Sequence, residues 1–146
     1  MLLRAVAGAR TGEDVEDLRT WLTELSGGPE VHETVVLHCG NHDDASATWA
    51  YAEADATSGI ARRRCLACGT AHPLLDSEQR WTHPPMWACQ GCGQSIAELA
   101  VGLSLPDGER VRWLALAARC VQCGRLAGLT DALVPDQPLR EVLRRL

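Results

Sequence analysis

The chain has 146 residues and a net charge of −5, which leaves room for one ordinary domain or two very small ones. It contains no Phe and a single Tyr, so five Trp must supply most of the aromatic packing, and cores this thin usually need metal ions or disulfides. No segment approaches the roughly 20 apolar residues of a membrane span, and Arg4 interrupts the apolar run that an export signal needs. We therefore expect a cytoplasmic protein, in which thiols stay reduced and CxxC spacing indicates metal or redox chemistry rather than disulfides.

An amphipathic helix is predicted near the N-terminus, within residues 1–30. Thr11 and Asp14 resemble a capping box, and acidic residues crowd the first turn. Apolar residues then recur at helical spacing, namely Val15, Leu18, Leu22 and Leu25, with Trp21 beside them. Gly27-Gly28-Pro29 is expected to end this helix.

A first β-hairpin is predicted between residues 43 and 64. Residues 47–54 alternate around Trp49 and Tyr51, residues 56–59 offer a turn, and residues 60–64 lead back.

A second hairpin is predicted between residues 93 and 119. One face of its first strand is apolar, at Ala97, Leu99, Val101, Leu103 and Leu105. Residues 106–109 (PDGE) form a strong turn signal, and the return strand answers with Val111, Trp113, Ala115 and Ala117. Residues 76–88, rich in Pro and Trp, are expected to connect the two hairpin units.

A C-terminal amphipathic helix is predicted for residues 136–146. Asp136 can cap it and Pro138 falls in its first turn. Its apolar stripe consists of Leu139, Val142, Leu143 and Leu146.

A short cysteine motif repeats between these elements and is the main signal in the sequence. Residues 65–69, 89–93 and 120–124 all read CxxCG, and residues 39–42 read CGNH. Together they supply eight candidate metal ligands: Cys39, His42, Cys65, Cys68, Cys89, Cys92, Cys120 and Cys123. Zinc prefers four thiolate or imidazole ligands in a tetrahedron, so two such knuckles can complete one site.

This arrangement of knuckle, hairpin and knuckle resembles the zinc-ribbon family, over residues 39–68 and 89–123. The resemblance implies a small, metal-stabilised α+β fold, in which two zinc-ribbon hairpin units (residues 31–75 and 89–135) are flanked by the two terminal helices. It also implies two Zn²⁺ ions, each held by the four ligands of one unit. His42 departs from the family's all-cysteine pattern, but zinc accepts three sulfurs and one nitrogen.

Several alternatives to this ligand assignment stay open. His38 and His72 compete with His42 for the eighth position. Knuckles one and three, and two and four, can also share ions in an interleaved arrangement. Iron is a chemical rival at the second site, since rubredoxins use CxxCG knuckles. A thioredoxin-like dithiol is disfavoured because no βαβ pattern follows any CxxC.

Residues 40–43 also spell GNHD, which resembles a motif of calcineurin-like metallophosphoesterases. That family needs further DxH and GDxxD motifs, and this chain contains neither. Asp43 and Asp44 are therefore interpreted as solvated residues that open the hairpin.

The predicted metal sites indicate a structural role. A metal ion with four protein ligands has no open position for water, so the sites are not expected to be catalytic. No Ser-His-Asp set, phosphate loop or paired catalytic carboxylates can be identified, and a non-enzymatic protein is predicted. We expect a protein-interaction or scaffold module that binds a protein partner and no membrane.

The charge distribution motivates a second hypothesis, nucleic-acid binding. Residues 1–60 hold 11 acidic residues and 3 Arg (net −8), whereas residues 61–146 hold 8 acidic residues and 11 Arg (net +3). The arginines that could form a basic stripe for a phosphate backbone are Arg62, Arg63, Arg64, Arg110, Arg112, Arg119, Arg125, Arg140, Arg144 and Arg145. Alternatively, these arginines balance the acidic half within the molecule.

Overall fold

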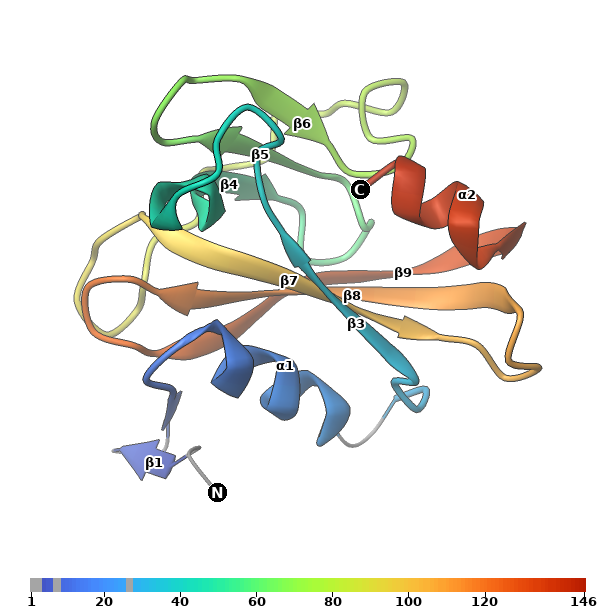
Figure 1. The fold of residues 1–146 in the computed structure, drawn as a ribbon, viewed down its shortest axis with the longest axis horizontal. Helices are drawn as coiled ribbons and strands as arrows, with labels where there is room; N and C mark the ends of the chain where they lie inside the picture. The colour runs from blue at the N-terminus through green and yellow to red at the C-terminus, as the bar shows by residue number, and fades with distance from the viewer. Residues whose placement is uncertain (1–3, 7–8, 26–27) are drawn as a thin grey trace.

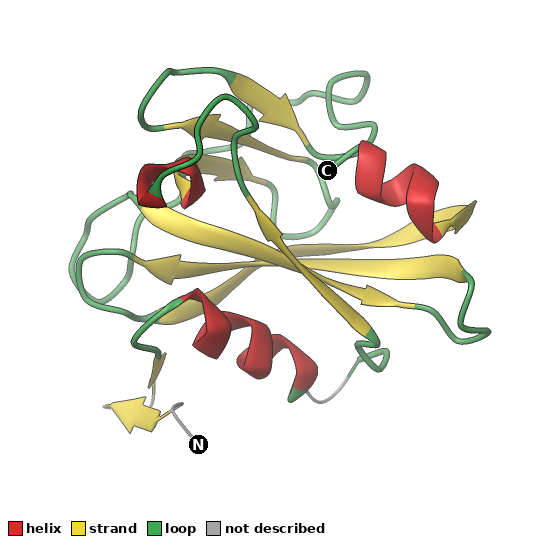
Figure 2. Ribbon diagram, viewed as in Figure 1, coloured by secondary structure: helices red, strands yellow, loops and turns green. Residues whose placement is uncertain are grey.

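The structure, a computed structural model, describes residues 4–6, 9–25 and 28–146 of the chain. Figure 1 shows its elements in chain order, and Figure 2 shows that strands dominate them. The elements are β1 (Arg4–Val6), β2 (Ala9–Thr11), α1 (Val15–Thr23), β3 (Glu33–Leu37), the 3-10 helix η1 (Ala45–Thr48), β4 (Trp49–Ala54), β5 (Ala61–Cys65), β6 (Ala71–Pro73), β7 (Ala97–Ser104), β8 (Arg110–Cys120), β9 (Leu126–Pro138) and α2 (Leu139–Arg144).

Most of the chain forms one antiparallel sheet of seven strands. The strand order is β6-β5-β4-β7-β8-β9, and β3 also pairs with β7. The two predicted hairpins are present, since β4 pairs with β5 and β7 pairs with β8. Over the described residues, the fold is therefore a small, mostly antiparallel β-structure with two α-helices.

Helix α1 covers one face of this sheet (Figure 1). Asp14 is its N-cap, because the Asp14 carboxylate accepts a hydrogen bond from the backbone N–H of Asp17 at 3.1 Å. The predicted capping box, with Thr11 as the cap and Asp14 three residues later, is therefore wrong, because Thr11 belongs to β2. Leu18 and Leu22 are 0% exposed and pack on β7 and β8, so the apolar stripe of α1 serves the protein's own core. No helix within the described residues is long and apolar enough to cross a membrane.

The main core lies on the opposite face of the sheet. Residues two apart in a strand share a face, and β7 shows this alternation clearly. Leu99, Val101 and Leu103 are buried in the main core, whereas Ala100 belongs to the smaller cluster under α1. Val142 of α2 is also buried in the main core.

The C-terminal part of the chain differs from the prediction. The helix was expected from residue 136, but residues 126–138 form the long strand β9, and α2 begins only at Leu139. Pro138 is the N-cap and makes no side-chain capping bond, and Asp136 lies within the strand. The pairing of β9 with β8 extends to Pro138, so extended backbone replaces the predicted first turn of the helix.

The two hairpins are joined into one sheet because segments next to each hairpin pair with strands of the other. β4 and β7 pair directly, with Ala50 opposite Ala97. β3 leads into the first knuckle but pairs with β7 of the second hairpin. Met86 lies shortly before the third knuckle but forms a bridge with β4 of the first hairpin, and the Trp87 N–H donates to the Ala52 carbonyl at 2.7 Å. The predicted connector therefore takes part in the hydrogen bonding of the shared sheet.

Candidate metal centres

Three of the four predicted knuckles share one backbone geometry. In each, the N–H of the glycine after the second cysteine donates to the carbonyl of the first cysteine at 2.8 Å. The pairs are Gly69 with Cys65, Gly93 with Cys89, and Gly124 with Cys120. The three glycines have φ values of 76°, 78° and 80°, a left-handed conformation that glycine adopts without steric cost. This local geometry explains why the CxxCG spelling recurs.

The fourth knuckle, from Cys39 to His42, is built differently. The His42 N–H donates to the Cys39 carbonyl at 3.4 Å. The Cys39 N–H donates to the carbonyl of Ala47, which is eight residues later in the chain. In the other three knuckles, the N–H of the first cysteine donates to the carbonyl of the residue five positions later. The chain therefore forms a larger loop here, which includes η1 and ends where β4 begins.

The first candidate centre gathers the ligands of knuckles one and two. Its members are Cys39, His42, Cys65 and Cys68, whose ligand atoms all lie within 4.8 Å of one another. The Sγ atoms of Cys39 and Cys68 are 3.8 Å apart. Cys39 and Cys65 are buried, whereas Cys68 is exposed. The knuckles are therefore grouped sequentially at this end of the chain.

The second candidate centre gathers the ligands of knuckles three and four. Its members are Cys89, Cys92, Cys120 and Cys123, again with all ligand atoms within 4.8 Å. The sulfurs of Cys89 and Cys123 are 3.6 Å apart, and those of Cys92 and Cys120 are 3.5 Å apart. All seven cysteines of the chain are free thiols, so no disulfide competes for them.

Histidine 42 is the imidazole that the structure brings into a candidate centre, and neither His38 nor His72 belongs to that group. The buried Nε2 atom of His42 has no hydrogen-bond partner among the described residues. A buried polar atom without a partner is costly, and metal coordination within the group would satisfy the imidazole. His72 has a similar unpaired Nε2 atom, and burial, followed by the charge of Arg63, lowers the pKa of its ring.

The thiols differ in their tendency to ionise. The hydroxyl and the backbone N–H of Thr70 lower the pKa of Cys68 to about 5, and the Thr70 hydroxyl lies 3.1 Å from the Cys68 sulfur. Burial raises the pKa of Cys120 to about 12. Metal binding requires thiolates, so a bound cation must displace the proton of Cys120.

A buried arginine lies against the first centre. Arg63 is 9% exposed, and its Nη2 atom donates to the carbonyl of His38 at 3.3 Å. Burial lowers the pKa of Arg63, whereas negative charge on the sulfurs of Cys39 and Cys65 raises it. A guanidinium keeps its proton, and no carboxylate of the described residues forms an ion pair with Arg63. The thiolates of a metal-bound cluster would supply the missing negative charge, so the donor set fits a divalent cation.

Sequence reasoning missed the roles of Arg63 and Thr70. Arg63 was counted only as part of a surface basic stripe, although Ala61, Arg63 and Cys65 alternate with more exposed residues in β5. The period of two in this strand was the available signal, because it places Arg63 on the same face as a ligand. No comparable signal singles out Thr70.

The acidic residue of the GNHD motif, Asp43, does not join the first candidate metal centre. The first group contains three cysteines and one histidine, and Asp43 is not a member. This composition lacks the carboxylates that the phosphoesterase resemblance required.

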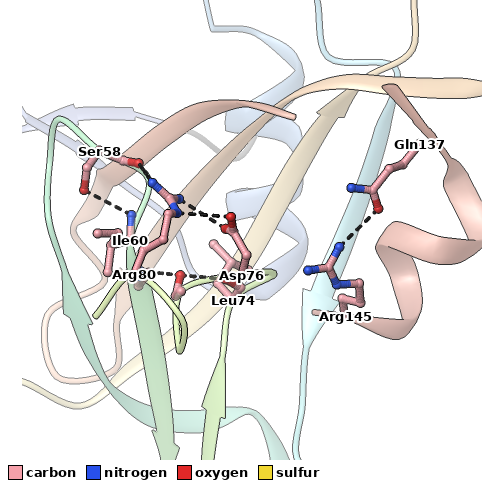
Figure 3. A network of polar contacts seen from close by, with 9 residues as sticks. Ser58, Ile60, Leu74, Asp76, Arg80, Gln137 and Arg145 are labelled. Atoms are coloured by element: carbon pink, nitrogen blue, oxygen red, sulfur yellow. Dashed lines mark hydrogen bonds and ion pairs between the residues drawn. The ribbon is translucent and has the colours of Figure 1, made fainter. Parts of the chain in front are cut away.

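A cavity of about 720 Å³ is lined by none of the eight predicted ligands. It lies between the β4–β5 turn, the segment after β6, and β9. On its walls Arg80 forms an ion pair with Asp76 at 3.1 Å, and Arg145 donates to the side-chain oxygen of Gln137 at 3.3 Å (Figure 3). The cavity and the candidate metal centres are therefore separate features.

Comparisons of the chain with models of known protein families, with curated proteins and with solved structures found no match.

Proposed function

We propose that the chain binds two structural Zn²⁺ ions, one in each group of four ligands. The observation that carries this proposal is the convergence of eight predicted ligands into two separate tetrads. The unpaired Nε2 atom of His42 and the buried charge of Arg63 support it at the first centre. Each set already offers four donors, so a bound ion would have no open position for a reacting water.

The proposed architecture is a pair of zinc ribbons within one sheet, over residues 31–75 and 89–135, with α1 and α2 as the flanking helices. Each hairpin is followed by a third strand, β6 after the first and β9 after the second, and the equivalent positions of these two strands support the proposal. β6 begins six residues after Cys65, at Ala71, and β9 begins six residues after Cys120, at Leu126. Each strand pairs with the strand that carries the preceding knuckle.

Elemental analysis of the purified protein tests the metal assignment. We expect two zinc ions per chain and a colourless protein. Four thiolates also suit iron. A red protein with visible thiolate charge-transfer bands would therefore reject zinc at the second centre.

We further propose a non-enzymatic role in the cytoplasm, as a protein-interaction or scaffold module. A non-enzymatic role is consistent with metal sites whose four positions are all taken by protein ligands. A cytoplasmic location is consistent with seven cysteines that form no disulfide. Large apolar side chains remain exposed for a partner, among them Met86 at 53% and Leu133 at 83%. These residues are better candidates for contact than the apolar stripe of α1, which the sheet covers.

The ion pairs favour a protein partner over nucleic acid. Several arginines of the predicted basic stripe already pair with carboxylates: Arg62 with Glu53 at 2.8 Å, Arg119 with Glu98 at 2.7 Å, and Arg144 with Glu141 at 2.8 Å. Paired arginines have less charge to offer to a phosphate backbone. An affinity pull-down from native cell extract, with and without nuclease, tests this preference. Capture that is lost on nuclease treatment would instead indicate a nucleic acid.

A further inference from the structure

The two candidate centres differ at one structurally equivalent position. Arg63 precedes Cys65 by two residues in β5, and Ala118 precedes Cys120 by two residues in β8. The pairing registers agree, because Arg63 lies opposite His72 and Ala118 lies opposite Ala127, each seven residues after the knuckle's first cysteine. The first centre therefore has a buried guanidinium where the second has a methyl group.

The donor sets carry different charges once a divalent ion is bound. Three thiolates and a neutral imidazole leave the first cluster with one negative charge, whereas four thiolates leave the second with two. Adding the permanent positive charge of Arg63 makes the first centre neutral as a whole.

The position of Arg63 gives this charge an effect that a surface arginine would lack. Charges in a buried environment interact strongly and cost free energy unless an opposite charge lies close by. The Arg63 hydrogen bond to the carbonyl of His38 also holds the residue directly before Cys39. At the second centre, Arg125 lies beside Gly91 of knuckle three, but it is only partly buried.

We propose that Arg63 is the internal counter-cation of the first metal centre, and that it matches this centre to a divalent ion. This inference rests on the proposed metal binding and deepens it. A trivalent ion would leave the cluster neutral and Arg63 buried without an anion. Arg63 is a positioning and charge-matching residue and is not itself a ligand.

Metal affinity of the full-length protein provides the test. Arg63→Met removes the charge but keeps a long side chain, and Arg63→Lys keeps the charge. Arg64→Met is the matched control, because Arg64 is an exposed neighbour that donates to the carbonyl of Gly69 in the same knuckle. Zinc is removed by increasing concentrations of a chelator. Alkylation of the freed cysteines followed by mass spectrometry then identifies which centre has lost its ion.

We expect Arg63→Met to weaken zinc binding at the first centre at least tenfold, with binding at the second centre changed less than twofold. Arg63→Lys should restore most of the affinity, and Arg64→Met should stay within twofold of the unchanged protein. A first centre unaffected by Arg63→Met would overturn the inference and leave the zinc proposal intact. Equal losses in Arg63→Met and Arg63→Lys would also overturn it, since they would indicate a role of shape and not of charge. If the protein with its own sequence bound no metal, both the inference about Arg63 and the zinc proposal would be overturned.

Discussion

Ala50 of β4 lies opposite Ala97 of β7, and each alanine also lies opposite a cysteine of a candidate metal centre. The four residues form one row across the sheet, in the order Cys65, Ala50, Ala97 and Cys120. With neighbouring strands about 4.8 Å apart, the two cysteines are separated by about 14 Å. Equivalent positions of the two hairpins therefore pair with each other at the centre of this row.

Replacement of one ligand should remove one ion and leave the other. Cys65→Ser breaks the first tetrad, so bound zinc is expected to fall from two ions per chain to one, while Cys89 and Cys92 stay protected from alkylation. Cys120→Ser is the reciprocal control and should expose the second centre alone. Elemental analysis with cysteine mapping provides the measurement, and loss of protection at Cys89 in Cys65→Ser would contradict the sequential grouping.

A large-to-small change in the shared core should destabilise the whole chain. Leu103 is fully buried in the main core, so Leu103→Ala is expected to lower the free energy of unfolding by about 2–5 kcal/mol. Leu133→Ala removes the same side chain from an exposed position and should change it by less than about 0.5 kcal/mol. Denaturant unfolding of the metal-loaded protein measures both, and similar effects for the two variants would contradict the described packing.

The β4–β5 turn should tolerate no side chain at Gly59. Gly59 has a φ of 76°, its N–H donates to the Thr130 hydroxyl at 3.1 Å, and an added Cβ would collide with the Cβ of Ala132. Gly108 has a similar φ of 81° but faces open space, so Gly108→Ala isolates the backbone cost, roughly 1–2 kcal/mol. We expect Gly59→Ala to lower the free energy of unfolding by about 1–3 kcal/mol more than Gly108→Ala. If Gly59→Ala and Gly108→Ala lowered the free energy of unfolding equally, the close approach of β9 to this turn would be contradicted.

The turn between β7 and β8 should owe stability to the charge of Asp107. The Asp107 carboxylate accepts hydrogen bonds from the N–H groups of Arg110 at 2.8 Å and Glu109 at 2.9 Å, and these bonds lower its pKa. A lowered pKa in the folded state means that the contribution is complete above the unfolded pKa of about 3.9 and is lost only below it, as the pH falls through the folded value.

Asp107→Asn keeps an acceptor but removes the charge, so it should lower the thermal midpoint of the metal-loaded protein by a constant amount between pH 8 and pH 5. Asp107→Ala removes the acceptor too and should lower it further. Differential scanning calorimetry at several pH values provides the measurement. A difference between the unchanged protein and the Asp107→Asn variant that varies across this range would implicate another titrating group, because the carboxylate stays ionised throughout it.

The features that could be predicted from the sequence are those whose causes are local. A CxxCG knuckle closes through backbone hydrogen bonds within six consecutive residues and a glycine with positive φ, so its spelling identifies it without knowledge of the rest of the chain. The hairpins followed from alternation and turn signals over neighbouring residues. Helix α1 followed from its apolar spacing and the acidic residues of its first turn, although its cap lies three residues later than predicted.

Features that depend on distant partners left no comparable local signal. Strand β9 includes Gly128 and Pro135, which weaken the alternation of an edge strand, and its conformation depends on pairing with β8. β3 pairs with β7 of the second hairpin, and Met86 forms a bridge with β4 of the first, so both pairings join segments far apart in the chain. Arg63 looked like one more surface charge, and only its burial and its hydrogen bond to the carbonyl of His38, directly before Cys39, give it a place beside the metal centre. Spacing along the chain thus determines which side chains can share an ion, whereas the charge around that ion depends on residues that only the folded sheet brings together.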